Sequence, residues 1–205
     1  MARDTRSIVK LSRREGYALH PKAHKALAKR TTPPGQAANA RIRNKPSQYA
    51  LQLREKQKVK RLYGLLEKQF SNLMAEASRT QGQSGGTVLQ YLERRLDNTV
   101  YRAGFAPSRR AARQLVTHGH FMLNGRRVDI PSIRMRIGDE ITLREHSKGT
   151  EYFKKLDDVS PAPSTIPEWL KVDRKKTAVT VTNLPVRDDA EPEINEQLIV
   201  EYYSR

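Results

Sequence analysis

The 205-residue chain has room for one or two domains and carries 39 lysine and arginine residues against 22 acidic residues, a formal net charge of +17. It has no cysteine, which excludes disulfides and thiolate metal sites, and no apolar run approaches the roughly 18–20 residues of a membrane-spanning helix. The first residues lack the apolar stretch of a secretory signal. We therefore expect a soluble intracellular protein with a polyanionic partner, nucleic acid before an anionic membrane.

The charge is divided unevenly along the chain. Residues 1–61 hold 17 basic and 3 acidic residues, residues 62–155 hold 16 and 9, and residues 156–205 hold 6 and 10. A basic arm, a basic middle and a mildly acidic end therefore follow one another.

Residues 1–46 form the basic N-terminal arm, which is polar and is interrupted by Pro33, Pro34 and Gly35. Little periodic apolar pattern occurs in it, so we expect little core to form there without help. One interpretation is a disordered tail. The other is an arm that becomes ordered on RNA, whose phosphates would offset the entropy of ordering.

Residues 47–86 are predicted to form a helical domain that begins at Ser47 as an N-cap. Gly64 costs about 1 kcal/mol relative to alanine in a helix, so it indicates a close packing contact or a nearby break. One apolar helix face is formed by Val59, Leu62, Leu66, Phe70, Leu73 and Ala77. Five basic residues crowd the start of the helix, and too few acidic residues alternate with them to pair them: Arg54, Lys56, Lys58, Lys60 and Arg61.

Residues 87–189 are predicted to form a second module with a C-terminal extension, after a flexible boundary at residues 80–86. Its first helix ends at Gly104, and its second begins at Pro107–Ser108 and stops at Gly119. The first helix buries Leu89, Leu92, Leu96, Val100 and Ala103, and the second buries Ala111, Ala112, Leu115 and Val116.

The dipeptide Asn124–Gly125 between apolar residues is a strong β-hairpin signal. A two-residue turn places Phe121 opposite Val128 and Met122 opposite Arg127, and residues 133–143 add one or two strands. The face predicted to be buried comprises Phe121, Leu123, Val128 and Ile130. The module is therefore two short helices packed on a small antiparallel sheet.

The end of the chain continues with a short helix from about residue 145 to 156, a linker at 159–167 and a strand at 178–186. Residues 190–205 are predicted to form a helix that completes the helical domain, with Ile194, Leu198 and Tyr202 buried. The predicted fold class is α+β: a mostly helical domain interrupted by the small module, with a basic N-terminal arm.

Arginines gather on the module in a way that indicates a phosphate partner. Arg109 and Arg110 lie in the first turn of a helix, where cations oppose the helix dipole by roughly 0.3–1 kcal/mol each. A phosphate outside the fold would favour them there, because free N–H groups and guanidinium groups can converge on it. A solvated or ion-paired surface arginine is the alternative for any single residue, but few acidic residues are available to pair the whole cluster. With only 6% aromatic residues, recognition of RNA shape and backbone is favoured over base stacking.

Metal and catalytic sites have weak support. His20 and His24 are four residues apart without an evident third ligand, so we expect no metal and no cofactor. Residues 95–97 read Arg-Leu-Asp, similar to the signature around the catalytic aspartate of pseudouridine synthases. We favour a helix-surface carboxylate at Asp97 that orients nearby arginines, because it lies within a helical stripe and no large catalytic domain follows.

Six blocks of sequence, in this order, resemble the family of bacterial ribosomal protein S4: residues 12–16, 33–36, 53–70, 95–105, 112–132 and 194–204. The resemblance implies a helical domain interrupted by an RNA-binding module. It also implies a structural, non-catalytic component of the small ribosomal subunit that binds the 5′ domain junction of small-subunit rRNA directly and nucleates assembly. A cytoplasmic ribosome is implied, with an organellar ribosome as the alternative.

The resemblance further implies a place at the channel through which mRNA enters, beside proteins S3 and S5, and no membrane partner. Arg41, Arg43 and Lys45 fall in the matching stretch, although Ala37 and Ala38 replace the usual His-Gly. Some members of the family hold zinc with cysteines, whereas Ser12 stands at one such place here, so a zinc-free form is implied.

The predicted RNA-binding residues extend over the arm, the helical domain and the module: Arg3, Lys10, Arg13, Arg14, Arg41, Arg43, Lys45, Arg54, Lys56, Lys58, Lys60, Arg61, Arg95, Asn98, Arg102, Ser108, Arg109, Arg110, Arg113, Gln114, His118, His120, Asn124, Arg126 and Arg127. Two alternatives are an RNA-modifying enzyme that uses Asp97 and a free-standing RNA-binding regulator.

Overall fold

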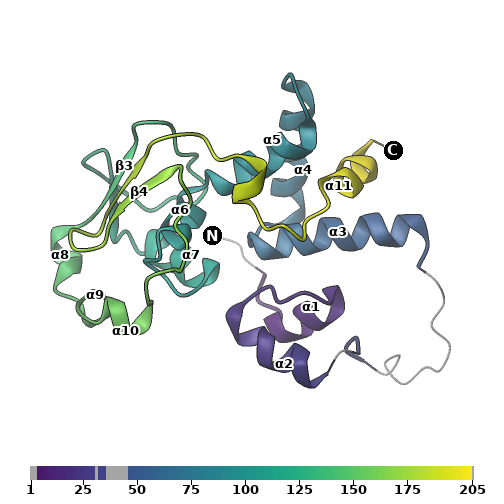
Figure 1. Ribbon diagram of the computed structural model, residues 1–205, viewed down its shortest axis with the longest axis horizontal. Coiled ribbons are helices and arrows are strands. Elements are labelled where there is room, and N and C mark those ends of the chain that lie inside the picture. The colour runs from purple at the N-terminus through teal and green to yellow at the C-terminus, as the bar shows by residue number, and fades with distance from the viewer. Residues whose placement is uncertain (1–3, 31, 36–45, 205) are drawn as a thin grey trace. The chain divides into compact units, whose positions relative to one another are not determined.

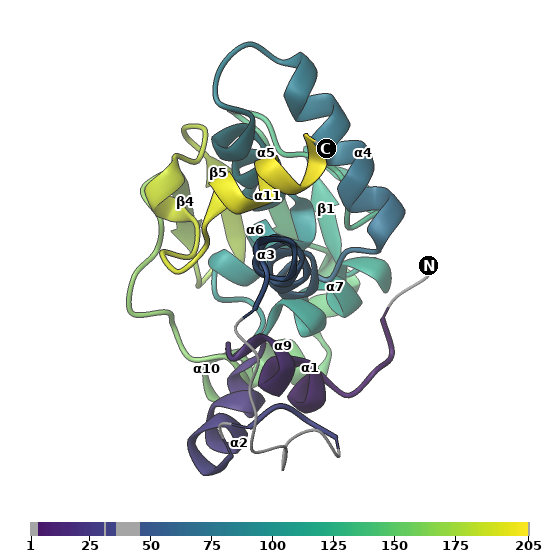
Figure 2. The same cartoon turned by 90° about the vertical axis from the view of Figure 1, so that its right-hand side faces the viewer.

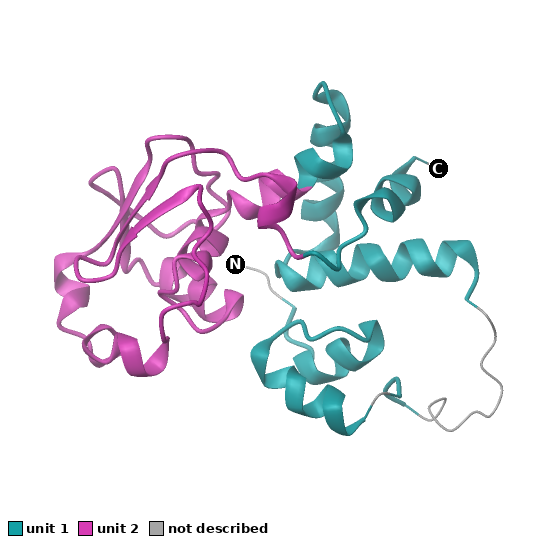
Figure 3. Cartoon of the chain, in the orientation of Figure 1, with its two compact units in different colours: residues 1–88, 192–205 teal, residues 89–191 magenta. Residues whose placement is uncertain are grey.

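The computed structural model describes residues 4–30, 32–35 and 46–204, and the chain divides into two compact units. Unit 1 comprises residues 1–88 and 192–205, and unit 2 comprises residues 89–191 (Figure 3). The described residues form eleven α-helices and one five-stranded antiparallel sheet (Figure 1). The α+β class predicted from the sequence is therefore confirmed.

Unit 1 is helical in its described residues. Its elements are α1 (Ile8–Glu15), the 3₁₀ helix η1 (Pro21–Ala23), α2 (His24–Lys29), α3 (Gln48–Leu62), α4 (Glu67–Arg79), the start of α5 (Ser84–Glu93) and α11 (Glu196–Tyr203).

The first part of the arm forms short helices that pack on one another and on α3, an arrangement that the sequence pattern did not predict. Leu11, Leu19 and Ala23 are buried, and α1 contacts α2 and α3. The Ser12 hydroxyl donates to the carbonyl of Ile8 at 2.8 Å and accepts from the backbone N–H of Leu19 at 3.3 Å. Scattered rather than periodic apolar residues build this core, which explains why the sequence pattern did not reveal it.

A break separates α3 from α4 at Gly64, one of the two outcomes predicted for that glycine. Its φ of +68° lies in the left-handed region, where a side chain would be strained. The turn also shifts the buried face: Leu65 and Met74 are buried, where the pattern predicted Leu66 and Leu73.

The C-terminal helix α11 packs across α3, as Figure 2 shows in a view along α3. Its N-cap is Asn195, whose side chain accepts from the backbone N–H groups of residues 197 and 198. Ile194 and Ile199 are buried, whereas Leu198 and Tyr202, two of the predicted core residues, are only half-buried.

Unit 2 combines short helices with the sheet. Its helices are the end of α5, α6 (Leu96–Arg102), α7 (Arg109–Thr117), α8 (Glu145–Lys148), α9 (Glu151–Lys154), α10 (Leu156–Val159) and the 3₁₀ helix η3 (Arg187–Asp189). Its strands are β1 (Phe121–Leu123), β2 (Arg126–Val128), β3 (Glu140–Leu143), β4 (Leu170–Asp173) and β5 (Ala178–Val181).

One predicted helix is two helices, α5 and α6, with a break at Arg94–Arg95. Arg95 forms an isolated antiparallel bridge with Arg134, which interrupts the helix. The predicted apolar stripe nevertheless lies in the interior, because all five of its residues are buried: Leu89, Leu92, Leu96, Val100 and Ala103.

The β1–β2 hairpin has the predicted register, with Phe121 opposite Val128 and Met122 opposite Arg127. Asn124 (φ 48°) and Gly125 (φ 77°) have the positive φ values of a type I′ turn. The predicted burial of Ile130 is wrong, since it lies beyond the last strand pair and is 50% exposed.

The five strands are ordered β2-β1-β3-β5-β4. Residues 133–137 form no strand, and β4 was not predicted. The core joins α6 and α7 to the sheet, through residues that include Val100, Val116, Phe121, Ile141 and Val179. The sheet thereby fixes the two helices that carry six of the predicted RNA-binding side chains: Asn98, Arg102, Arg109, Arg110, Arg113 and Gln114.

Candidate RNA-binding surface

Asp97 fixes two of the predicted RNA-binding arginines. Its carboxylate accepts from Arg95 Nε at 3.0 Å and Nη2 at 2.9 Å, and from Arg113 Nη1 at 3.2 Å. The backbone N–H of Asn98 also donates to it at 3.0 Å. Asp97 is thus buried in the first turn of α6 and orients arginines as expected, although it is not on the helix surface.

Glu93, a fully buried carboxylate at the end of α5, fixes a second group. It accepts from Arg102 Nε and Nη2, both at 2.9 Å, and from the Asn98 side-chain amide at 2.7 Å. Asn98 in turn accepts from Arg109 Nε at 2.9 Å. Glu93 therefore sets the positions of two arginines, directly for Arg102 and through Asn98 for Arg109.

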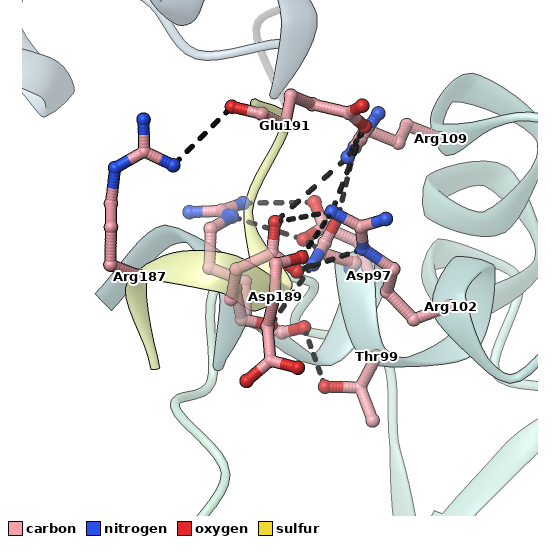
Figure 4. Close-up of polar contacts among 10 residues, drawn as sticks. Asp97, Thr99, Arg102, Arg109, Arg187, Asp189 and Glu191 are labelled. Carbon is pink, nitrogen blue, oxygen red and sulfur yellow. Dashed lines mark hydrogen bonds and ion pairs between the residues drawn. The ribbon is translucent and has the colours of Figure 1, made fainter. Parts of the chain in front are cut away.

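Glu191 completes this arrangement from the far end of unit 2 (Figure 4). Its Oε1 accepts from Arg109 Nη2 at 2.9 Å and lies 3.6 Å from Arg102 Nη2. Arg102 also donates to the backbone carbonyl of Asp189 at 2.9 Å. The segment that contains η3 is thereby held against α6 and α7.

The expectation that few acidic residues pair the arginine cluster is wrong for four of its members. Glu93, Asp97 and Glu191 compensate Arg95, Arg102, Arg109 and Arg113 inside the fold. Burial also lowers the pKa of Arg113, although Asp97 opposes this shift. The unfavourable position of Arg109 at the start of α7 is thus offset by carboxylates of the chain itself.

The exposed part of the predicted site is a polar face of α7. Arg110, Gln114 and His118 recur every four residues and are all exposed. The guanidinium group of Arg127 lies over Gly119, where an added Cβ would be 2.8 Å from its Nε, so the hairpin extends this face. We call these four residues, Arg110, Gln114, His118 and Arg127, the α7 face. Ser108 contributes structure, because its buried hydroxyl caps α7 by accepting from the N–H of residue 111 at 3.2 Å.

His120 differs from the exposed His118 because it is half-buried. Its Nδ1 lies 3.0 Å from the Ser147 hydroxyl, and its ring packs edge-on against Phe153. Burial lowers the pKa of His120, and the neighbouring His118 and Arg144 lower it further. The imidazole is therefore predominantly neutral at neutral pH.

The hairpin tip carries two further predicted residues, Asn124 and Arg126, both exposed. The Asn124 side chain accepts from the N–H of Glu140 at 2.9 Å and donates to Asp139 at 2.8 Å. Asn124 therefore ties the turn to the start of β3.

Carboxylates also pair the basic residues of α3, although most of these partners come from other helices and do not alternate with them in the sequence. The partners come from other elements and from α3 itself. Arg54 and Arg61 pair with Glu15, Lys56 and Lys60 pair with Glu67, and Lys58 pairs with Glu55 and donates to the carbonyl of Glu193. Burial raises the pKa of Glu15 despite these arginines.

On the arm, Lys10 and Arg14 are exposed one helical turn apart on α1. Arg13 instead donates to the carbonyl of Thr32 at 2.9 Å, which ties α1 to a later part of the arm. Four other predicted residues, Arg3, Arg41, Arg43 and Lys45, lie outside the described residues.

Over the described ranges, no group of three or more histidine or acidic side chains is arranged to hold a metal ion. His20 Nδ1 accepts from the backbone N–H of Lys22 at 3.0 Å and so caps η1. The Ser12 hydroxyl is hydrogen-bonded to two backbone groups, and the sequence contains no cysteine that could supply a thiolate ligand. Within the described part of the chain, no helix is both long enough and apolar enough to cross a membrane.

The fold and this basic surface together are those expected of an RNA-binding protein. Residues 3–93 match the family model of the ribosomal protein S4/S9 N-terminal domain, and residues 94–141 match that of the S4 domain. The chain belongs to the ribosomal protein S4 family.

Relatives along the whole chain agree with this assignment. Over 100% of both sequences the chain is 50% identical to small ribosomal subunit protein uS4 of Chlorobaculum tepidum and 49% identical to that of Chloroflexus aurantiacus. It is also 49% identical to uS4A of Symbiobacterium thermophilum over 100% of both. The resemblance seen in the sequence blocks is confirmed, and the alternative of an RNA-modifying enzyme is set aside.

Proposed function

We propose that the protein is a structural component of the small ribosomal subunit that binds small-subunit rRNA directly. The observation that carries the proposal is the similarity, at about half identity and from end to end, to proteins named small ribosomal subunit protein uS4. The net charge of +17 supports a polyanionic partner.

In unit 2, we propose that the α7 face makes the first contacts with rRNA phosphates, joined by Arg126 at the hairpin tip. Arginine and lysine contacts to phosphate dominate the affinity of such proteins. The four residues of this face include no phenylalanine, tyrosine or tryptophan, which favours recognition of RNA shape over stacking on bases. The packed arginines of α6 and α7 stiffen the helices that present it.

Lys56 and Lys60 of α3 are buried and the Arg61 side chain is only 7% exposed, which argues against their predicted contact with RNA. In unit 1, we propose that Lys10 and Arg14 of α1, together with Arg54 of α3, whose side chain is 41% exposed, bind a separate rRNA segment. Two basic surfaces on one chain raise each other's effective concentration on a folded RNA. This supports binding at a multi-helix junction in the 5′ domain and a role in nucleating assembly. In this proposal residues 1–46 act as the basic arm, residues 47–86 with 190–205 as the helical domain and residues 87–189 as the RNA-binding module.

We further propose a place at the channel through which mRNA enters, beside proteins S3 and S5, in ribosomes of the cytoplasm. Arg41, Arg43 and Lys45 are the residues assigned to that channel. Their charge and their place after the Pro-Gly-Gln block support the assignment.

Sedimentation tests the proposal against a free-standing RNA-binding regulator. A tagged chain produced in bacterial cells should co-migrate with small subunits and stay bound during a high-salt wash, whereas a regulator would wash off. Arg110→Gln with Arg127→Gln should reduce incorporation. Lys175→Gln with Lys176→Gln removes the same charge from exposed positions outside the proposed surface and should leave incorporation unchanged.

A further inference from the structure

Two carboxylates face the same pair of arginines but differ in burial. The Glu93 side chain is 0% exposed, whereas that of Glu191 is 22% exposed. Arg102 and Arg109 lie between them, with side chains 18% and 13% exposed. Two positive charges therefore meet one deeply buried and one accessible negative charge.

Glu93 is a permanent part of the fold. Its oxygens accept from Arg102 at two positions and from Asn98, all at 2.7–2.9 Å. Removing these bonds would leave buried donors without partners, which costs more than the bonds contribute when present. Glu93 neutralises one of the two guanidinium charges and leaves the second for Glu191.

Glu191 contacts the two arginines through a single oxygen, whereas Glu93 uses both of its oxygens. The same oxygen, Oε1, accepts from Arg109 at 2.9 Å and lies 3.6 Å from Arg102. A phosphate oxygen binds a guanidinium group with the same distance and geometry as a carboxylate oxygen. The Glu191 carboxylate thus occupies a position that suits one phosphate oxygen (Figure 4).

We propose that Glu191 is an intramolecular substitute for phosphate, which occupies an RNA phosphate position on Arg109 and Arg102 in the free protein and is displaced when RNA binds. This inference rests on the proposed rRNA-binding function of unit 2. Because Glu191 is part of the chain, it competes at a high effective concentration with any single phosphate. Only an RNA that binds the α7 face at the same time displaces it, so Glu191 lowers the affinity for RNA of the wrong shape.

Glu191→Gln tests the inference, with Glu193→Gln as its matched control. Both changes remove one negative charge, two residues apart, but the Glu193 side chain is exposed and only its backbone carbonyl is used, by Lys58. We expect Glu191→Gln to bind an unrelated structured RNA about 3- to 10-fold more tightly, the range of a hydrogen bond to a partly exposed charged group. Glu193→Gln should change this affinity less than about 2-fold, as expected for a screened surface charge.

The selectivity for the transcribed 5′ domain of small-subunit rRNA over the unrelated RNA should fall in Glu191→Gln. Equal affinities for Glu191→Gln and Glu193→Gln would overturn the inference. A thermal melt of each full-length variant shows that it is folded. Inorganic phosphate gives a readout without RNA: it should raise the melting temperature of Glu191→Gln more than that of the wild type, and equal shifts would contradict a vacated anion position.

Arg109→Gln separates this inference from the proposed function. If Arg109→Gln weakens binding to the rRNA while Glu191→Gln changes nothing, the phosphate site stands and the substitution by Glu191 is wrong. If Arg109→Gln leaves the affinity for the rRNA unchanged, the arginine is outside the interface and the proposed RNA site on unit 2 fails at this position.

Discussion

Replacing Asp97 with asparagine should destabilise the protein strongly, although the two side chains have nearly the same shape. Oδ1 of Asp97 accepts from Arg95 and from the Asn98 backbone, and Oδ2 accepts from Arg95 and Arg113. An amide can supply an acceptor at only one of these positions. Its NH₂ group would then face guanidinium donors at the other.

The magnitude follows from burial. The side chains of Arg95 and Arg113 are only 7% and 14% exposed, so water cannot fully replace the lost carboxylate. Removing one partner of a buried pair costs about 3–5 kcal/mol, and we expect about 2–4 kcal/mol because the amide keeps one acceptor. For a chain of this length each kcal/mol lowers the melting temperature by roughly 2–4 °C, which gives a decrease of about 5–15 °C.

Thermal melts and urea titrations of Asp97→Asn and Asp129→Asn, followed by circular dichroism, test this prediction. Asp129 is exposed, so its replacement makes the same change in net charge and should alter the free energy of unfolding by less than about 0.5 kcal/mol. If both variants melt together with the wild type, Asp97 does not hold α6 and α7, and the arginines are ordered by something else.

Four further substitutions are predicted to alter stability, each measured as the free energy of unfolding. Gly86→Ala should stabilise α5 by about 0.5–1 kcal/mol, because no other atom lies within 4 Å of the added methyl group. Gly85→Ala should destabilise the protein, because its methyl group would lie 2.8 Å from the Glu196 side chain of α11. Equal effects of the two substitutions would refute the packing of α11 on α5. Gly125→Ala should cost about 1–2 kcal/mol through strain at φ +77°, and an unchanged urea midpoint would argue against the type I′ turn. Partial burial raises the pKa of Glu67, but hydrogen bonds from two lysines of α3 outweigh it and lower the value to about 2. The stabilisation by Glu67 is thus complete above the ordinary pKa of 4.5 and is lost as the pH falls towards 2. Glu67→Gln should therefore be less stable than the wild type at pH 6, and the difference in free energy of unfolding should vanish near pH 2. A difference that stays constant with pH would contradict the ion pairs.

Local signals in the sequence predicted the parts of the fold that depend on neighbouring residues. The Asn124–Gly125 turn and the pairing of Phe121 with Val128 follow from a two-residue loop and an alternation of side chains. The N-cap at Ser108 follows from the preference for a hydroxyl at that place. These interactions span a few residues, so the sequence alone defines them.

The pairing of charges could not be predicted in this way. Glu191 meets Arg109 across 82 residues, and Glu15 meets Arg61 across 46, so no spacing in the sequence connects them. The excess of acidic residues in 156–205 indicated only in general that this segment could pair with basic residues, as Glu191 does with Arg109. The contacts of Glu93 are more local, because it lies five residues before Asn98 and nine before Arg102 in the sequence.

The core of the arm was missed for a related reason. Leu11, Leu19 and Ala23 are too irregularly spaced to form one apolar stripe, and the helix α1 that carries Leu11 packs on α2 and on the distant α3. Long-range packing of this kind outweighs composition, which had indicated a chain with little structure of its own.

The central claim is direct, shape-specific binding of rRNA, and a salt titration tests it most directly. Binding of the full-length chain to the transcribed 5′ domain of small-subunit rRNA would be compared with binding to an unrelated structured RNA of equal length. The account predicts a strong preference for the rRNA that persists as salt rises, with the slope of log affinity against log salt reduced by about 0.7–0.9 for each phosphate contact removed from the α7 face. Equal affinities that fall together with salt would mean that the charge of +17 binds RNA without specificity and would contradict the account.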